Sequence, residues 1–373
     1  MTTVPAAVHR PSSAPHARPR PTVPPAGPGW YSSVMGTGIL ATLLGRETGR
    51  LPFLIVPAVA LLVVGVGLLV GLTSAFMVRI ARDRSALTST ITDASVVTAW
   101  GTVSMGVLSI GSAVLTVVPQ LGTPEATHWA VPVDVVLWTA GTALGVVTAF
   151  GFGAVLIRRD VGHPIPAWGL PIVPPMVSAT TGAALVPHVA APLGHLALLA
   201  VTIACFWLSL FLGGLVFALA YHHHWTVGTL PIPASASAWI PLGVVGQSMA
   251  AAQSIAAQTR SVLTPAMADA GQTLADVYGF VMLVVAVPVV AWALAMTIRG
   301  FRARMPFSPA WWALTFPLGT LALGTRMLGQ ATGIGAVSIV GAVSIVGLAC
   351  TWTLCATATL RAVWEHRRAV PAA

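Results

Sequence analysis

Residues 51–72 read LPFLIVPAVALLVVGVGLLVGL, an uncharged and almost wholly apolar run. A helix of about 20 such residues is long enough to cross the hydrocarbon core of a bilayer. Similar runs recur along the chain of 373 residues, of which 56% are hydrophobic and only 7% are charged. A soluble domain carries about 25% charged residues. The sequence therefore predicts an all-α polytopic membrane protein.

Ten transmembrane helices are predicted from these runs. They cover residues 30–45, 52–78, 92–118, 132–157, 169–187, 193–220, 239–259, 273–298, 309–329 and 334–361. Residues 1–29 are rich in Pro, Ser and Arg and lack the short apolar core of a cleavable signal peptide, so we expect a retained, disordered tail. The transmembrane domain is expected at 30–361 and a second, short tail at 362–373.

The arginines predict how these helices are oriented. All 18 basic residues are arginines, and an N-terminus in the cytoplasm leaves only Arg46, Arg50, Arg260 and Arg326 on the opposite side. Because positive residues are enriched in cytoplasmic loops, both termini are expected in the cytoplasm, with the protein in the cytoplasmic membrane. Short arginine clusters beside membrane helices also explain the net charge of +9 without a nucleic-acid partner.

Polarity alternates along the ten segments. The even-numbered segments are long and oily, whereas the odd-numbered ones contain Gly, Pro, hydroxyls and amides, as in WIPLGVVGQSMAAAQSIAAQ at 239–258. Such groups are tolerated within a membrane where they line a water-filled cavity. The simplest arrangement is five helical hairpins, each with its polar helix turned inward around a central pore. Close helix packing through small residues is the alternative explanation.

The pore-lining candidates lie on the odd-numbered segments. In the seventh, Gln247, Ser254 and Gln258 recur at a spacing that places them on one helical face. The whole set is Ser32, Gly36, Thr37, Gly38, Thr102, Pro175, Ser178, Thr181, Gln247, Ser254, Gln258 and Thr320. No acidic or basic residue is predicted at mid-membrane on these segments. Hydroxyls, amides and helix dipoles then suit anions better than cations.

Two arginines are predicted near the extracellular ends of inner helices. Arg260 and Arg326 either attract anions to the mouth of the pore or extend to the lipid headgroups. The acidic residues Asp93, Asp134 and Asp276 are expected to cap helices.

Neither the cysteines nor the histidines indicate a metal site. Cys205, Cys350 and Cys355 lie in membrane segments without metal-ligand spacing. The run His222 to His224 is expected on a solvated cytoplasmic loop. No cofactor and no metal are expected.

Three motifs carry a family resemblance: GWYSSVMGTGI at 29–39, LPIVPPMVSATTGA at 170–183 and FSPAWWALTFPLGTLALGT at 307–325. In this order they resemble the tellurite-resistance/dicarboxylate transporter family. That family includes the bacterial protein TehA, the slow-type anion channels of plant guard cells, and fungal malate and sulfite transporters. The resemblance covers Trp30 to Arg361. It implies hairpins in a quasi-fivefold arrangement around one pore per subunit, and a homotrimer.

The resemblance also implies a gate. In the channel members a phenylalanine of the ninth helix blocks the pore, and Phe316 is matched to it because it precedes Pro317, which removes a helix hydrogen bond and can bend the helix. Phe307, at the membrane edge, is the weaker match. A ring that only packs is the alternative.

Together these features predict transport of small anions, such as chloride, nitrate, sulfite, tellurite or malate, through a Phe-gated pore. No Gly-rich loop followed by Lys is present, so transport without ATP hydrolysis is expected. A proton-coupled dicarboxylate or sulfite carrier is the alternative, although the inner segments offer no ionisable group at mid-membrane. An intramembrane enzyme is the remote alternative, because the sequence has no HExxH motif and no paired intramembrane Asp.

Overall fold

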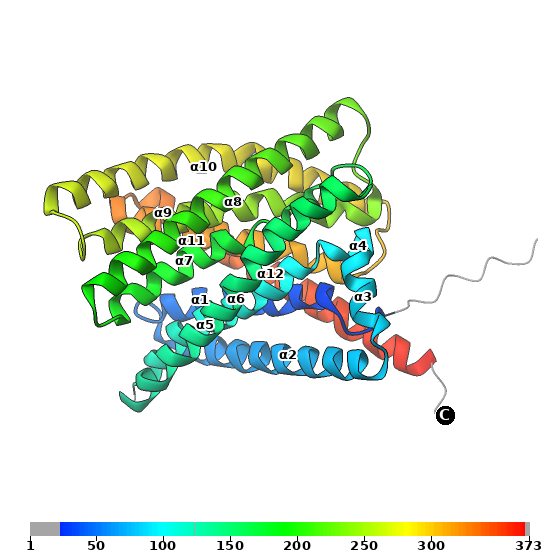
Figure 1. The fold of residues 1–373 in the computed structure, drawn as a ribbon, viewed down its shortest axis with the longest axis horizontal. Coiled ribbons are helices and arrows are strands. Elements are labelled where there is room, and N and C mark those ends of the chain that lie inside the picture. The colour runs from blue at the N-terminus through cyan, green and yellow to red at the C-terminus, as the bar shows by residue number, and fades with distance from the viewer. Residues whose placement is uncertain (1–22, 123, 370–373) are drawn as a thin grey trace, which may run out of the picture.

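The computed structural model describes residues 23–122 and 124–369, and the regular structure within these ranges is helical (Figure 1). The main helices are α1 (Tyr31–Glu47), α2 (Ile55–Arg82), α5 (Trp100–Val117), α6 (Pro124–Arg158), α7 (Pro174–Leu185), α8 (Pro192–Thr226), α9 (Ile240–Thr259), α10 (Pro265–Arg302), α11 (Phe316–Thr332) and α12 (Gly335–Ala369). Two short helices, α3 (Ser85–Thr92) and α4 (Ala94–Val97), follow α2. The predicted all-helical class is confirmed.

Several odd-numbered segments are interrupted, as their prolines and glycines predict. The fifth consists of a 3₁₀ turn η4 (Pro166–Gly169), the helix α7 and a second turn η5 (Val186–His188). The ninth consists of η7 (Pro309–Leu314) followed by α11, and η6 (Ile232–Trp239) precedes α9. Each of these elements has a proline in its first turn. A proline has no N–H to donate and is accommodated best at such a start, where that N–H would have no partner within the helix.

Burial follows the predicted alternation in polarity. The helices α1, α7, α9 and α11 are almost wholly buried, whereas α2, α6, α8, α10 and α12 expose large apolar side chains. Six helices of the described chain are long and apolar enough to cross a membrane: Pro52–Arg82, Trp100–Leu121, His128–Arg158, Pro192–Thr226, Pro265–Arg302 and Gly335–Arg368. Three of the buried helices are short, with 17 residues in α1, 12 in α7 and 17 in α11. The chain is therefore a multi-pass membrane protein.

The contacts between helices form a closed circuit. α1 packs against α5, α5 against α7, α7 against α9, α9 against α11, and α11 returns to α1. Each remaining long helix packs against two members of this circuit: α2 on α1 and α5, α6 on α5 and α7, α8 on α7 and α9, α10 on α9 and α11, and α12 on α11 and α1. We call α1, α5, α7, α9 and α11 the inner helices and the other five the outer helices.

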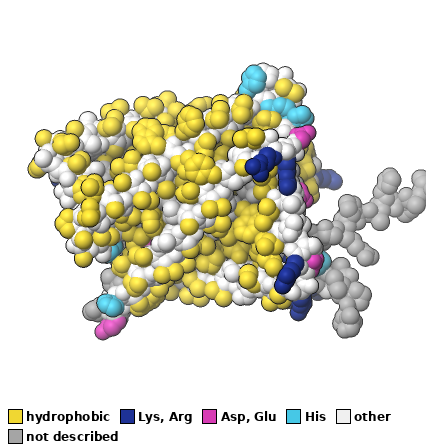
Figure 2. Space-filling model, viewed as in Figure 1, with side chains coloured by type: hydrophobic (Ala, Val, Ile, Leu, Met, Phe, Trp, Pro, Cys, Tyr) yellow, Lys and Arg dark blue, Asp and Glu magenta, His cyan; other side chains and the backbone are white. Residues whose placement is uncertain are grey.

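The two ends of the described chain lie at the same end of the bundle (Figure 1). On the face drawn in Figure 2, Arg side chains gather at that end, near α3 and α4, and hydrophobic side chains cover the side of the bundle. We call this the arginine-rich end.

The boundaries of the predicted tails differ from the structure. Residues 1–22 lie outside the described residues, but 23–29, expected to be disordered, pack against the bundle. Arg79 Nη1 donates to the Ala26 carbonyl at 2.9 Å, and Trp30 Nε1 donates to the Pro24 carbonyl at 3.0 Å. At the other end, α12 continues as a helix to Ala369, so most of the expected tail 362–373 is helical.

Two predicted helix caps are wrong. Asp134 lies within α6 and Asp276 lies within α10, because both outer helices begin about two turns earlier than the apolar runs alone indicate. Asp93 lies between α3 and α4, and its carbonyl accepts backbone N–H groups of Val96 and Val97. The predicted histidine loop is also wrong, since His222 to His224 form the last turns of α8.

Candidate functional site: two cavities along the inner helices

Phe316 lies where the ninth segment passes from a 3₁₀ helix to an α-helix. η7 ends at Leu314, Thr315 has φ −98° and ψ −66°, and α11 begins at Phe316 with Pro317 behind it. The Thr315 hydroxyl donates to the Trp312 carbonyl at 2.6 Å and so satisfies an acceptor at the break. The predicted interruption is thus present, as the start of a new helix and not as a bend in a continuous one. The Phe316 side chain is 3% exposed.

Two cavities lie among the inner helices. The wide cavity has a volume of about 700 Å³ and is lined by residues that include Arg79, Ser32, Thr102, Ile240 and Ala313. The narrow cavity has a volume of about 40 Å³, enough for a few waters at most. Its lining is Ile39, Thr42, Arg46, Ser109, Ser112, Leu115, Thr116, Asp134, Val177, Thr180, Thr181, Ala184, Gln247, Phe316 and Leu323.

The two cavities follow one another along the inner helices. On α1, Ser32 and Met35 line the wide cavity, and Ile39, Thr42 and Arg46 line the narrow one. These positions are spaced by three and four residues, so they form one stripe of the helix. The same order holds on other elements, from Thr102 to Ser109 on α5, from Ile240 to Gln247 on α9, and from Ala313 to Phe316 across the break.

The two cavities share no lining residue, and the layer between them lies at the level of Met35 to Ile39 on α1 and of Ala313 to Phe316 on the ninth segment. The Phe316 ring lines the narrow cavity directly beyond this layer. The wide cavity reaches Arg79, which lies in the last turn of α2. It therefore belongs to the arginine-rich end, and the narrow cavity belongs to the other half of the bundle.

Part of the predicted pore lining is found in these cavities. Ser32 and Thr102 line the wide cavity, and Thr181, Gln247 and Phe316 line the narrow one. Gln247 Nε2 donates to Thr180 Oγ1 at 2.9 Å, whereas Gln247 Oε1 is buried without a partner among the described residues.

The other predicted lining residues line neither of these two cavities: Gly36, Thr37, Gly38, Pro175, Ser178, Ser254, Gln258 and Thr320. Several of them make contacts between helices instead. A side chain at Gly36 would clash with Thr315, and Thr37 Oγ1 accepts a hydrogen bond from Trp352 Nε1 at 2.9 Å. At Gly36 and Thr37 the structure therefore shows close packing between helices, which is the alternative explanation for small and polar residues on the inner helices.

Sequence reasoning missed two charged residues of the narrow cavity, Arg46 and Asp134. The sequence could have predicted Arg46, because this residue continues the three- and four-residue spacing of the lining residues that begins at Ser32 on α1. Asp134 lies on an outer helix and left no such signal. Its carboxylate reaches the cavity beside Gly111 of α5, where any side chain would clash with Asp134 Oδ1.

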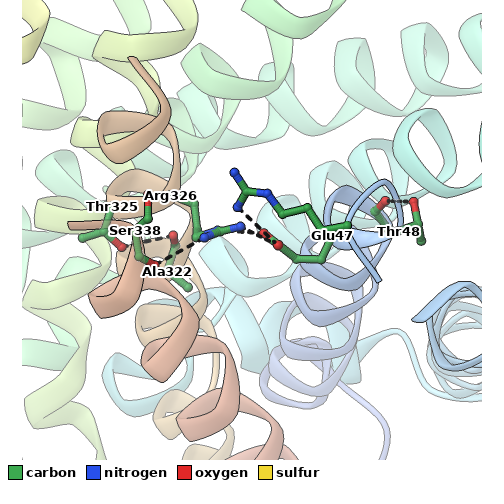
Figure 3. Close-up of polar contacts among 8 residues, drawn as sticks. Glu47, Thr48, Ala322, Thr325, Arg326 and Ser338 are labelled. Atoms are coloured by element: carbon green, nitrogen blue, oxygen red, sulfur yellow. Dashed lines mark hydrogen bonds and ion pairs between the residues drawn. The ribbon is translucent and has the colours of Figure 1, made fainter. Parts of the chain in front are cut away.

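Arg326 and Arg260 are both held in ion pairs. Arg326 Nε donates to Glu47 Oε1 at 2.7 Å, and Nη2 contacts Glu47 Oε2, which links α11 to α1 (Figure 3). Arg260 Nη2 lies 2.7 Å from Asp269 Oδ1 on the surface. Attraction of anions by these arginines stays a prediction, and each positive charge already has a carboxylate beside it. Among the described residues, no group of three His, Cys, Asp or Glu residues could hold a metal ion.

The sequence profile of the SLAC1 family, described as voltage-dependent anion channel, matches residues 26–360. The chain belongs to this family. It is also 26% identical over 314 residues to the sulfite efflux pump SSU1 of Trichophyton rubrum, a match that covers 81% of each chain. The sulfite efflux pump SSU1 of Arthroderma otae is 25% identical over 316 residues, again with 81% of each chain covered.

Membership of this family confirms the predicted resemblance and places the chain among membrane anion transporters and channels, not among enzymes. The match begins within the ordered residues 23–29 and ends in α12, so it includes every inner and outer helix.

Proposed function

We propose that the inner helices enclose a pore for small anions and that the Phe316 ring closes it. The observation that carries this proposal is the layer between the two cavities, because Phe316 lies beside it at the one break in the ninth segment. Moving one aromatic ring would then join two cavities that already lie in line.

The closed circuit of inner helices supports a quasi-fivefold arrangement of five hairpins around this pore. Each outer helix packs on the inner helix of its own hairpin and on the inner helix of the next. A homotrimer, which the family resemblance implies, stays a prediction that the mass of the detergent-solubilised protein would check.

Sulfite is the first anion to test, because the fungal relatives are named as sulfite efflux pumps. Transport would follow electrochemical gradients without ATP hydrolysis. A proton-coupled carrier for sulfite or dicarboxylates is the second candidate, and the carboxylate of Asp134 in the narrow cavity favours it.

The experiment is anion flux into proteoliposomes, measured for sulfite, chloride, nitrate and malate with the unaltered chain and with Phe316→Ala. We expect a several-fold higher flux with the selectivity order unchanged. Phe307→Ala is the matched control, since Phe307 belongs to the same segment but lines neither cavity, and it should leave the flux unchanged.

Two other outcomes would change this conclusion. Saturable, proton-dependent flux that Phe316→Ala abolishes would assign the ring to the binding site of a carrier. Equal flux for the unaltered chain and for Phe316→Ala would mean that the ring only packs, and the proposed gate would be wrong.

A further inference from the structure

Asp134 is a buried carboxylate to which the pore proposal assigns no role. It is 1% exposed, and neither of its side-chain oxygens has a hydrogen-bond partner among the described residues. It nevertheless lines the narrow cavity, in space that Gly111 leaves free on the neighbouring helix α5. Burying an ionised carboxylate without a partner costs free energy. The presence of Asp134 at this position therefore indicates a functional role.

Arg46 is the other charged residue of the narrow cavity, which it lines from an exposed position in the last turn of α1. The elements with the closest packing against α6 are α5, α7 and η3 (Val118–Leu121), and their sequences contain no titratable side chain. On α6 itself, Glu125 and His128 are exposed near its start and Arg158 is exposed at its end. Beside Arg46, Glu47 is already bound to Arg326. The charge of the cavity therefore depends on Arg46 and Asp134.

The protonation state of Asp134 decides what the cavity offers to an anion. With an ionised Asp134, the positive charge of Arg46 is offset and the cavity has no net charge. With a protonated Asp134, the charge of Arg46 is no longer offset by a carboxylate of the same cavity, and its attraction for an anion is stronger than in bulk water because the cavity is partly enclosed by protein. The exchange itself is simple: a proton from cavity water adds to one carboxylate oxygen and later returns to water.

We propose that Asp134 is a proton-binding residue that controls anion occupancy beside Arg46, so that the narrow cavity takes up a small anion together with a proton. The inference rests on the proposed function, since it concerns the same pore, and it adds a link between anion passage and pH. Phe316 controls whether the two cavities connect, and Asp134 controls whether an anion is held beyond the ring.

The test measures flux of sulfite, chloride and nitrate in proteoliposomes between about pH 5 and about pH 8. The readout is the flux of Asp134→Asn divided by that of the unaltered chain at each pH, because titration of sulfite itself cancels in this ratio. Asn keeps the shape of the side chain and stays neutral. We expect a ratio near one at acidic pH that rises to about tenfold at alkaline pH, where only the unaltered chain carries the negative charge.

Two further variants complete the design. Asp276→Asn is the matched control, since Gln253 and Gln272 both donate to this carboxylate at 2.9 Å and it lies outside the narrow cavity. The flux of Asp276→Asn divided by that of the unaltered chain should be the same at every pH. Arg46→Gln removes the charge that Asp134 is proposed to control, so its flux should be low and should no longer rise with acidity.

The outcomes separate the two proposals. A constant ratio for Asp134→Asn overturns the role of Asp134, even if Phe316→Ala raises the flux as expected. If Asp134→Asn does not fold, Arg46→Gln still decides, because an unchanged rise in flux with acidity would contradict the inference. If no anion moves through the unaltered chain or through Phe316→Ala, it is the proposed function that fails.

Discussion

The ion pair between Glu47 and Arg326 joins the first inner helix to the last. The exposed fractions of the two side chains are only 13% and 10%, and Arg50 Nη1 lies 3.8 Å from the same carboxylate. Removing one partner of a buried pair leaves an uncompensated charge. This contact closes the circuit of inner helices between segments 279 residues apart in the chain.

Glu47→Gln is therefore expected to lower the free energy of unfolding by about 3 kcal/mol or more. The measurement is thermal or denaturant unfolding of the detergent-solubilised protein. Asp269→Asn is the control, because it breaks the exposed pair with Arg260 and should cost less than about 1 kcal/mol. Equal losses for the two variants would contradict a special role of the buried pair.

At the scale of elements, the packing of α9 against α11 depends on glycine. A Cβ at Gly246 would clash with Leu321 N and lie 2.6 Å from the Thr320 carbonyl carbon, and a Cβ at Gly324 would lie 2.6 Å from the Gly246 carbonyl oxygen. These obstacles are backbone atoms, so they cannot move aside like the end of a flexible side chain. The two helices approach closely only because both positions lack a side chain.

Gly246→Ala is expected to push α9 and α11 apart and to destabilise the protein by about 1–3 kcal/mol. Gly67→Ala is the matched control. It adds the same methyl group to the outer helix α2, at an exposed position with no atom within 4 Å, and should be neutral or slightly stabilising. Unfolding midpoints of the two variants check this, and a midpoint for Gly246→Ala at or above that of the unaltered chain would contradict it.

At the scale of the whole molecule, the arginine-rich end predicts how the protein is oriented in the membrane. We expect this end, with both described chain ends, to face the cytoplasm. Ser85 is exposed at the start of α3 at this end, and Ser261 is exposed after α9, which runs from the wide cavity toward the opposite end.

Single cysteines at these positions would test the orientation, in a chain from which the exposed Cys350 has been removed. A membrane-impermeant maleimide should label Ser261→Cys in intact cells and should label Ser85→Cys only after permeabilisation. The reverse pattern would show that the protein lies in the membrane with the opposite orientation.

The sequence by itself determined the helical membrane class, the alternation of polarity and the break before Pro317. These properties could be predicted because composition records whether a helix can face lipid, and because proline limits the backbone wherever it stands. The break is correctly placed at Phe316 for the same reason.

The tertiary structure alone decided which polar residues line a cavity and which contact another helix. Thr37 and Gly36 looked like pore residues, but they lie where α12 and the ninth segment pack on α1. Asp134 looked like a helix cap, but it reaches the narrow cavity from an outer helix. Helical periodicity places residues on a common face, but what that face meets depends on how distant segments pack. Only the folded chain therefore brings Arg46, Asp134 and Phe316 to one cavity.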